Sequence, residues 1–134
     1  MTDFATYLGT VIGIIGLAIA FWQHRQRKQL EHVIRANNWF NYARSNNATG
    51  NTQLALTLYK EKHTDNLSPE VIEQLAKADA FGQEVYKESV RQLHFSEPSF
   101  TKKDIERWKG EGKINDKSAP LFLQLSTHTK EKNV

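Results

Sequence analysis

The sequence predicts an all-α fold, with one N-terminal transmembrane helix followed by a small cytoplasmic bundle of four to five helices. Three observations lead to this prediction. Residues 4–22 carry no charge, whereas all 18 Lys and Arg residues lie after them. Apolar residues in the later part recur at helical spacing, and no stretch alternates with the two-residue period of a strand. A chain of 134 residues has room for one folded core but not for two.

The uncharged stretch is long enough to span a bilayer. Its 19 residues would form a helix of roughly 28 Å, close to the thickness of the hydrocarbon layer. Tyr7 and Trp22 stand near its two ends, and aromatic residues favour the surfaces of a membrane. We therefore expect residues 1–22 to form a transmembrane anchor.

The charges beside the anchor predict its orientation. Arg25, Arg27 and Lys28 follow the apolar stretch, whereas only Asp3 precedes it. The positive-inside rule then places the N terminus outside and residues 23–134 in the cytoplasm. Membrane lipid is the expected partner of the three basic side chains, because headgroups on the cytoplasmic side are often anionic.

A cleaved signal peptide is the main alternative to an anchor. The sequence Ala18-Ile19-Ala20 has the small residues of a cleavage site. However, a signal peptide carries its basic residues before the apolar region, and here they follow it. This order of charges favours an anchor that stays on the mature chain.

Small residues in the anchor predict self-association. They recur every three or four positions, so they share one helix face: Ala5, Gly9, Gly13, Gly16 and Ala20. Such a face lets neighbouring helices approach closely in lipid, which predicts a homo-oligomer. Two alternatives stay open. Thr6 and Thr10 could line a narrow pore, or the glycines could simply reflect how common glycine is in transmembrane helices.

The remaining elements follow in chain order. A basic juxtamembrane helix over residues 23–45 continues the anchor into the cytoplasmic part. Residues 46–51 are rich in asparagine and include a glycine, which predicts the end of that helix and the start of a helical domain over residues 46–125. Its first helix covers about 52–63. The polar residues 126–134 predict a flexible tail.

Capping signals predict two helix starts within the domain. Ser68 precedes Pro69, a residue that favours the first turn of a helix, and the helix extends to about residue 93. Thr101 and Asp104 form a capping-box pattern, with Phe100 and Ile105 placed as a hydrophobic staple. This helix ends near 110 or 112, and a short apolar piece over 121–125 is last. The helical spacing assigns further side chains to a core: Leu54, Leu58, Ile72, Leu75, Phe81, Val85, Tyr86 and Leu93.

The sequence contains no signature of an enzyme. Cysteine is absent, and the five histidines form no compact pair with the spacing of metal ligands. No glycine-rich phosphate loop or nucleophile motif occurs. We therefore expect no catalytic residues, no metal and no cofactor. The modest net charge of +3 also argues against binding to duplex nucleic acid.

One segment has the composition of a ligand site. Arg35, Trp39, Tyr42 and Arg44 lie among three asparagines, a combination that can stack on a planar ring and bind an anion. On a helix, residues 35, 39 and 42 share one side. The alternative is that the aromatic residues belong to the core, which is the usual place for aromatics at helical spacing.

In layout, the chain resembles the small membrane effectors of prokaryotic antiphage defence systems, which join a short transmembrane part to a compact cytosolic sensor. The pattern Ile105-x-x-Trp108-x-x-x-Gly112-Lys113-Ile114-Asn115 is also similar to short bacterial oligomerisation modules called SHOCT. These resemblances imply self-assembly at the inner membrane. The first also implies a nucleotide second messenger as ligand, and perturbation or permeabilisation of the membrane. The other hypothesis is a passive anchor or scaffold whose helical domain binds a protein partner.

Overall fold

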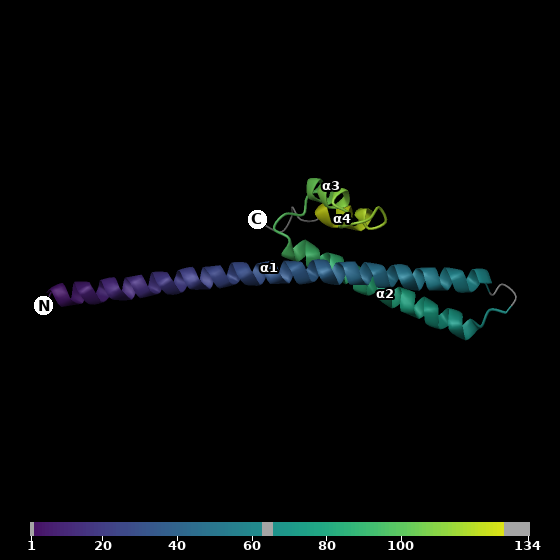
Figure 1. Cartoon of the computed structure of the whole chain (residues 1–134), viewed down its shortest axis with the longest axis horizontal. Helices are drawn as coiled ribbons and strands as arrows, with labels where there is room; N and C mark the ends of the chain where they lie inside the picture. The colour runs from purple at the N-terminus through teal and green to yellow at the C-terminus, as the bar shows by residue number, and fades with distance from the viewer. Residues whose placement is uncertain (1, 63–65, 128–134) are drawn as a thin grey trace. The chain divides into compact units, whose positions relative to one another are not determined.

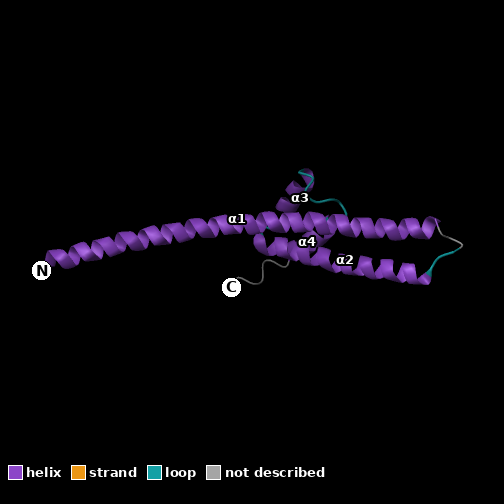
Figure 2. Ribbon diagram, turned by 60° about the horizontal axis from the view of Figure 1, so that its bottom comes forward, coloured by secondary structure: helices purple, strands orange, loops and turns teal. Residues whose placement is uncertain are grey.

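The computed structural model describes residues 2–62 and 66–127, with side chains described from Tyr7 onward. All regular secondary structure in these residues is helical. Within these residues there are four helices and no strand: α1 (Thr2–Lys62), α2 (Pro69–Ser96), α3 (Lys102–Gly110) and α4 (Ala119–Thr127) (Figures 1 and 2). The prediction of an all-α fold is confirmed. Most of the predicted tail, residues 128–134, lies outside the described residues, as do the side chains of Ala5 and Thr6.

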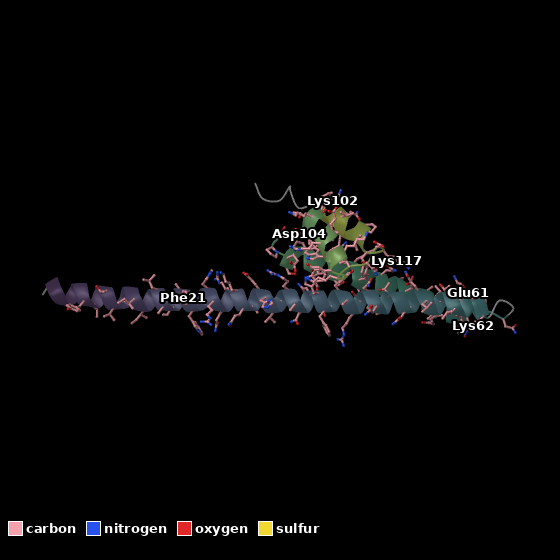
Figure 3. All side chains as sticks on the ribbon, turned by 45° about the horizontal axis from the view of Figure 1, so that its top comes forward. Phe21, Glu61, Lys62, Lys102, Asp104 and Lys117 are labelled. Carbon is pink, nitrogen blue, oxygen red and sulfur yellow. The ribbon has the colours of Figure 1, made fainter. Side chains whose placement is uncertain are left out.

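The chain divides into two compact units, Met1–Ile34 and Arg35–Val134, and each is described by itself. We call the second unit the helical domain. The first unit consists of the N-terminal part of α1, whose apolar side chains from residue 7 to residue 22 are exposed. Phe21, for example, is 70% exposed (Figure 3). Among the described helices, α1 alone is long and apolar enough to cross a membrane, and none of its apolar window is buried.

The asparagine-rich residues 46–51 do not end a helix, so that prediction is wrong. α1 runs through them to Lys62, and α2 returns alongside its C-terminal part (Figure 2). Two buried hydroxyls tie the helices together. Ser45 Oγ lies 2.8 Å from Ser89 Oγ, and Thr49 Oγ1 donates to the carbonyl oxygen of Gly82 at 3.1 Å. These contacts with α2 outweigh the poor helix propensity of asparagine and glycine.

Both predicted helix starts are confirmed. Ser68 is the N-cap of α2 and Pro69 its first residue, although the Ser68 side chain makes no capping hydrogen bond. At α3 the capping box is complete, because Thr101 Oγ1 accepts from the backbone N–H of Asp104 and the Asp104 carboxylate accepts from that of Thr101. Hydrogen bonds from the Ser99 hydroxyl and from Thr101 lower the pKa of Asp104 to about 2.

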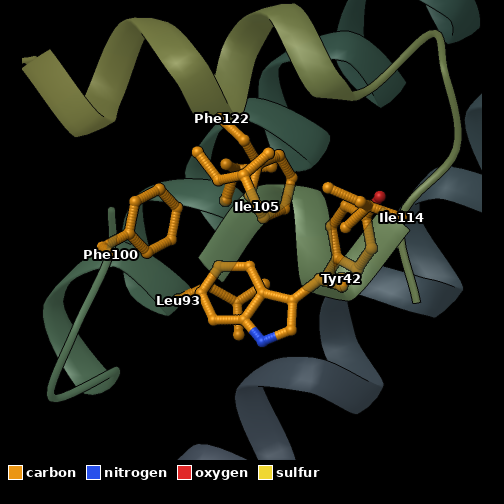
Figure 4. Close-up of a cluster of buried hydrophobic side chains, with 8 residues drawn as sticks. Tyr42, Leu93, Phe100, Ile105, Ile114 and Phe122 are labelled. Atoms are coloured by element: carbon orange, nitrogen blue, oxygen red, sulfur yellow. The ribbon is translucent and has the colours of Figure 1, made fainter. Parts of the chain in front are cut away.

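The core lies where α3 and α4 pack on α1 and α2 (Figure 4). Its aromatic rings meet mostly edge to face: Phe122 contacts Tyr42 at 5.3 Å between centroids and stacks on Phe100 at 5.5 Å. The capping-box neighbours Phe100 and Ile105 are both buried, as the hydrophobic staple predicts. The complete set is Tyr42, Val90, Leu93, Phe100, Ile105, Trp108, Ile114 and Phe122.

The predicted core residues divide into two groups. Leu93 is fully buried, Tyr86 packs against the core while half-buried, and Ile72 and Leu75 are half-buried. The prediction is wrong for Leu54, Leu58, Phe81 and Val85, which are exposed by 42 to 69%. Away from α3 and α4, α1 and α2 face only each other, so a two-helix hairpin leaves much of its apolar surface uncovered.

Candidate functional site

The basic side chains that follow the apolar stretch are exposed on α1. Arg25, Arg27 and Lys28 all lie in the first unit, beyond Trp22. The glycines of the anchor are exposed too, and a Cβ built on Gly9, Gly13 or Gly16 would meet no described atom within 4 Å. Packing within the described chain therefore does not require glycine there. Contact with lipid, and association through Gly9, Gly13, Gly16, Ala20 and Ala5, stay predictions.

The predicted ligand residues Arg35 and Trp39 converge on a carboxylate. The indole Nε1 of Trp39 donates to Oε1 of Glu97 at 2.6 Å, and Arg35 Nε lies 3.8 Å from the same oxygen. Glu97 is the C-cap of α2, and its side chain is 10% exposed. An acidic side chain of the protein thus occupies the position that the sequence suggested for an external anion.

The other two predicted ligand residues lie apart from this carboxylate. Tyr42 is 2% exposed and belongs to the core, where Trp39 contacts it edge to face at 5.9 Å between centroids. The guanidinium of Arg44 lies 4.7 Å from the centroid of the exposed Phe40 ring. The structure therefore brings Arg35, Trp39 and Tyr42 to one side of α1 but does not add Arg44 to them. Ligand binding by the four residues stays a prediction.

A polar hollow lies between α1, α2 and the turn that precedes α4. Its volume is about 460 Å³. Its lining is almost entirely amide and hydroxyl side chains: Asn46, Asn47, Thr49, Gly50, Asn51, Gln53, Gln83, Tyr86, Asn115, Lys117 and Ser118. Such groups can both donate and accept hydrogen bonds.

One wall of the polar hollow is fixed by a hydrogen-bonded serine. Ser118 is 1% exposed, and its hydroxyl donates to Oδ1 of Asn115 at 2.7 Å and lies 3.4 Å from Oδ1 of Asn46. Its backbone N–H also donates to Asn115 Oδ1, at 2.8 Å. These bonds join the turn before α4 to the middle of α1.

Two tyrosine hydroxyls near this wall make no well-aligned hydrogen bond with a described residue, although each lies close to the other and to the Ser118 hydroxyl. They belong to Tyr42 and Tyr86, whose rings lie 5.9 Å apart. Burial raises the pKa of Tyr42 to about 12 and also raises the pKa of Tyr86, while the nearby Ser118 hydroxyl acts in the opposite direction. Both phenols are therefore protonated donors at neutral pH. Of the two, only Tyr86 lines the polar hollow.

Sequence reasoning missed the polar hollow because it assigned the asparagine run to a helix end. The useful signal was present: several poor helix formers stand together, flanked on both sides by helical periodicity. The other half of the hollow comes from Asn115, Lys117 and Ser118, which are distant in sequence. Their pattern resembles an ordinary turn, so only the fold reveals the site.

An apolar groove lies on another face of the α1–α2 hairpin. It has a volume of about 620 Å³ and contains the exposed Phe81 and Val85. Arg44 of α1 lines it, as do Glu84 and Glu88 of α2. The groove thus combines an apolar floor with one basic and two acidic side chains.

The described residues contain no group of three or more His, Cys, Asp or Glu side chains that could hold a metal ion. His63 and His128 lie outside them. Comparison of the chain with protein-family models, with curated proteins and with solved structures finds no match.

Proposed function

We propose that the protein is a single-pass protein of the bacterial inner membrane. The observation that carries this proposal is the exposed apolar length of α1 from residue 7 to residue 22, followed directly by Arg25, Arg27 and Lys28. Water does not favour so long an uncovered apolar helix, whereas a bilayer does. The one-sided basic flank favours an N terminus outside and a helical domain in the cytoplasm.

The protein self-associates in this proposal, first through its anchor. The glycines on one face of the anchor fill no packing need within the described chain. Glycine in a helix interior costs about 1 kcal/mol relative to alanine in water. Close approach of a second anchor helix gives these residues a use.

The apolar groove supports the same conclusion for the helical domain, with a second copy of the chain as its occupant. The Ser45–Ser89 contact fixes the register of α1 against α2. The neighbouring residues Arg44 and Glu88 therefore lie at the same height along the helix axes. Rotation about a two-fold axis parallel to the helices does not change the height of any residue along them. The two helical domains therefore have their Arg35 ends on the same side. The rotation brings Arg44 of each copy to Glu88 of the other, which makes the groove self-complementary in charge.

The helical domain is the sensor of the protein in this proposal, and it controls how the anchors assemble and perturb the membrane. The polar hollow supports a sensing role, because it is a concave site with many hydrogen-bonding groups. No catalytic role is proposed. A passive scaffold that binds a protein partner is the alternative.

The test combines topology and permeability in intact bacteria. A reporter fused to the C terminus and active only in the periplasm should stay silent. Entry of a membrane-impermeant dye should rise when the full chain is expressed together with an enzyme that makes a nucleotide second messenger. The matched control is the double variant Gly9→Ile, Gly13→Ile, which should insert equally well but give less dye entry. An active periplasmic reporter would overturn the orientation. Unchanged dye entry with every activator tried would favour the passive scaffold.

A further inference from the structure

We infer that the polar hollow binds a small hydroxyl-rich molecule with one anionic group, the chemical class of sugar phosphates and nucleotides. This inference rests on the proposed sensing role of the helical domain, for which it names the site and the class of ligand. Four features of the described residues carry it: the poor helix formers of α1 that line the hollow, the chemistry of the lining groups, a buried tyrosine hydroxyl and the size of the hollow.

The first feature is a conflict between local sequence and fold. Asn47, Gly50 and Asn51 are exposed in the middle of α1, where asparagine and glycine disfavour a helix. Packing does not explain Gly50, since a Cβ built on it would meet no described atom within 4 Å. All three line the polar hollow. Residues that oppose the local structure without a packing reason are typical of functional sites.

The second feature is the chemistry of the lining. Amide side chains dominate it, and an amide can pair with a sugar hydroxyl or with the edge of a base. Lys117 is the only charged residue among the described residues that line the hollow. An anionic group therefore meets one lysine and no carboxylate, whereas a cation would find no opposite charge.

The third feature is the buried and poorly satisfied hydroxyl of Tyr86. The ring is half-buried against the core, and its buried hydroxyl lies beside the Ser118 and Tyr42 hydroxyls without a well-aligned hydrogen bond to either. A buried donor of this kind is costly unless it is satisfied. Because Tyr86 lines the hollow, an oxygen of a bound ligand can accept its proton. Tyr42 has a similarly buried hydroxyl but is not among the lining residues.

The fourth feature is size. A volume of about 460 Å³ falls within the range of roughly 300–1,000 Å³ for small-molecule sites. It suits one nucleotide or one sugar phosphate rather than a polymer. The rigid part of the wall, Ser118 with Asn115 and Asn46, is already hydrogen-bonded, so this part of the site is formed before a ligand arrives.

The experiment uses the full chain in detergent micelles and isothermal titration calorimetry. The probes are adenosine monophosphate, glucose 6-phosphate and inorganic phosphate. We expect at least one of the two organic phosphates to bind saturably and more tightly than inorganic phosphate. Tyr86→Phe should weaken that binding about tenfold, the effect of one lost hydrogen bond, and Lys117→Met should weaken it by a similar factor.

Two matched controls separate binding from folding. Tyr42→Phe removes the neighbouring hydroxyl, which does not line the hollow, and should weaken binding much less than Tyr86→Phe does. Asn51→Leu should abolish binding by filling the hollow, whereas Asn37→Leu makes the same change on an exposed part of α1 outside its lining and should not. Thermal unfolding of each variant, followed by circular dichroism, should show that Tyr86→Phe is no less stable than the parent. A loss of stability in step with affinity would make Tyr86 a structural residue and overturn its place in the site.

The remaining outcomes are decisive as well. If none of the three probes binds, or if Tyr86→Phe and Tyr42→Phe weaken binding equally, the inference is wrong. Inorganic phosphate that binds as tightly as the organic phosphates would reduce the site to an ion contact at Lys117 and overturn the ligand class. Binding at the hollow without any ligand-dependent change in dye entry would instead overturn the proposed sensing role and leave the site intact.

Discussion

The indole Nε1 of Trp39 donates a hydrogen bond of 2.6 Å to Oε1 of Glu97, across 58 residues of sequence. This bond fixes the C-terminal end of α2 to α1. It lies beside the core, since Trp39 also contacts the buried Trp108 edge to face at 5.1 Å between centroids. Arg35 shares the same carboxylate. The three side chains form a polar border of the core, where they hold α1 and α2 together.

Replacing Glu97 with Gln should destabilise the helical domain. The change weakens a charge-assisted hydrogen bond and removes the negative charge beside Arg35, so we expect a loss of about 1–3 kcal/mol in the free energy of unfolding. The measurement is denaturant unfolding followed by tryptophan fluorescence. Glu106→Gln, an exposed site on α3, is the matched control and should change stability by less than about 0.5 kcal/mol. Equal effects of the two variants would contradict this account.

Two glycines should respond to alanine in opposite ways. At Gly50 a new Cβ meets no described atom within 4 Å, so Gly50→Ala should stabilise α1 by up to about 1 kcal/mol. At Gly82 the new Cβ would lie 3.3 Å from Thr49 Oγ1, the hydroxyl that bonds the Gly82 carbonyl. Gly82→Ala should therefore destabilise the α1–α2 contact despite the better helix propensity of alanine. Thermal unfolding of both variants tests this, and a lower midpoint for Gly50→Ala would contradict it.

Stability at low pH should depend on Asp104. The pKa of this carboxyl is lowered in the folded state from 3.8 to about 2, chiefly by the Ser99 and Thr101 hydroxyls. A lowered pKa stabilises the fold above the unfolded value, and the contribution is lost as pH falls through the folded value. The gap in unfolding temperature between the parent and Asp104→Asn should therefore narrow from pH 4 down to about pH 2. Glu106→Gln is the control, and a constant Asp104→Asn gap across this window would contradict the assignment.

Charge reversal tests the proposed two-fold contact between helical domains. Arg44→Glu should weaken self-association, because it places two acidic side chains together, and Glu88→Arg should weaken it through two basic ones. The double variant restores opposite charges and should recover most of the association. Analytical ultracentrifugation in detergent measures the self-association of each variant. All variants also carry Gly9→Ile and Gly13→Ile, so that the anchors contribute less to association. Failure of the double variant to recover association would exclude this pairing.

Local signals predicted the parts of the fold that depend on short-range physics. The N-cap at Ser68, the capping box at Thr101 and the staple of Phe100 and Ile105 each involve residues within five positions of one another. Helical spacing placed Leu93 correctly as well. The same spacing failed for Phe81 and Val85, because periodicity shows which residues share a face but not whether another helix covers that face.

The candidate sites were harder to predict, since they depend on distant partners. Arg35 and Trp39 do lie together, yet the residue that meets them is Glu97, which nothing nearby in the sequence marks. The asparagine run was interpreted as a helix end because local sequence does not show that Ser45 and Thr49 of α1 make contacts with α2. The polar hollow is built from three segments at once, and no sequence signature marks the Tyr86 hydroxyl that lines it.

The position of Phe122 in the chain constrains how the protein is made. This ring is completely buried and contacts Tyr42, Phe100 and Trp108, so the core closes only after residue 122 has left the ribosome. In the proposed topology, the apolar segment reaches the membrane long before that moment. The nascent helical domain would thus wait at the bilayer surface without a core, and a premature stop before codon 122 would leave an inserted but unfolded product. Protein quality control, rather than loss of targeting, would then decide the fate of such truncated chains.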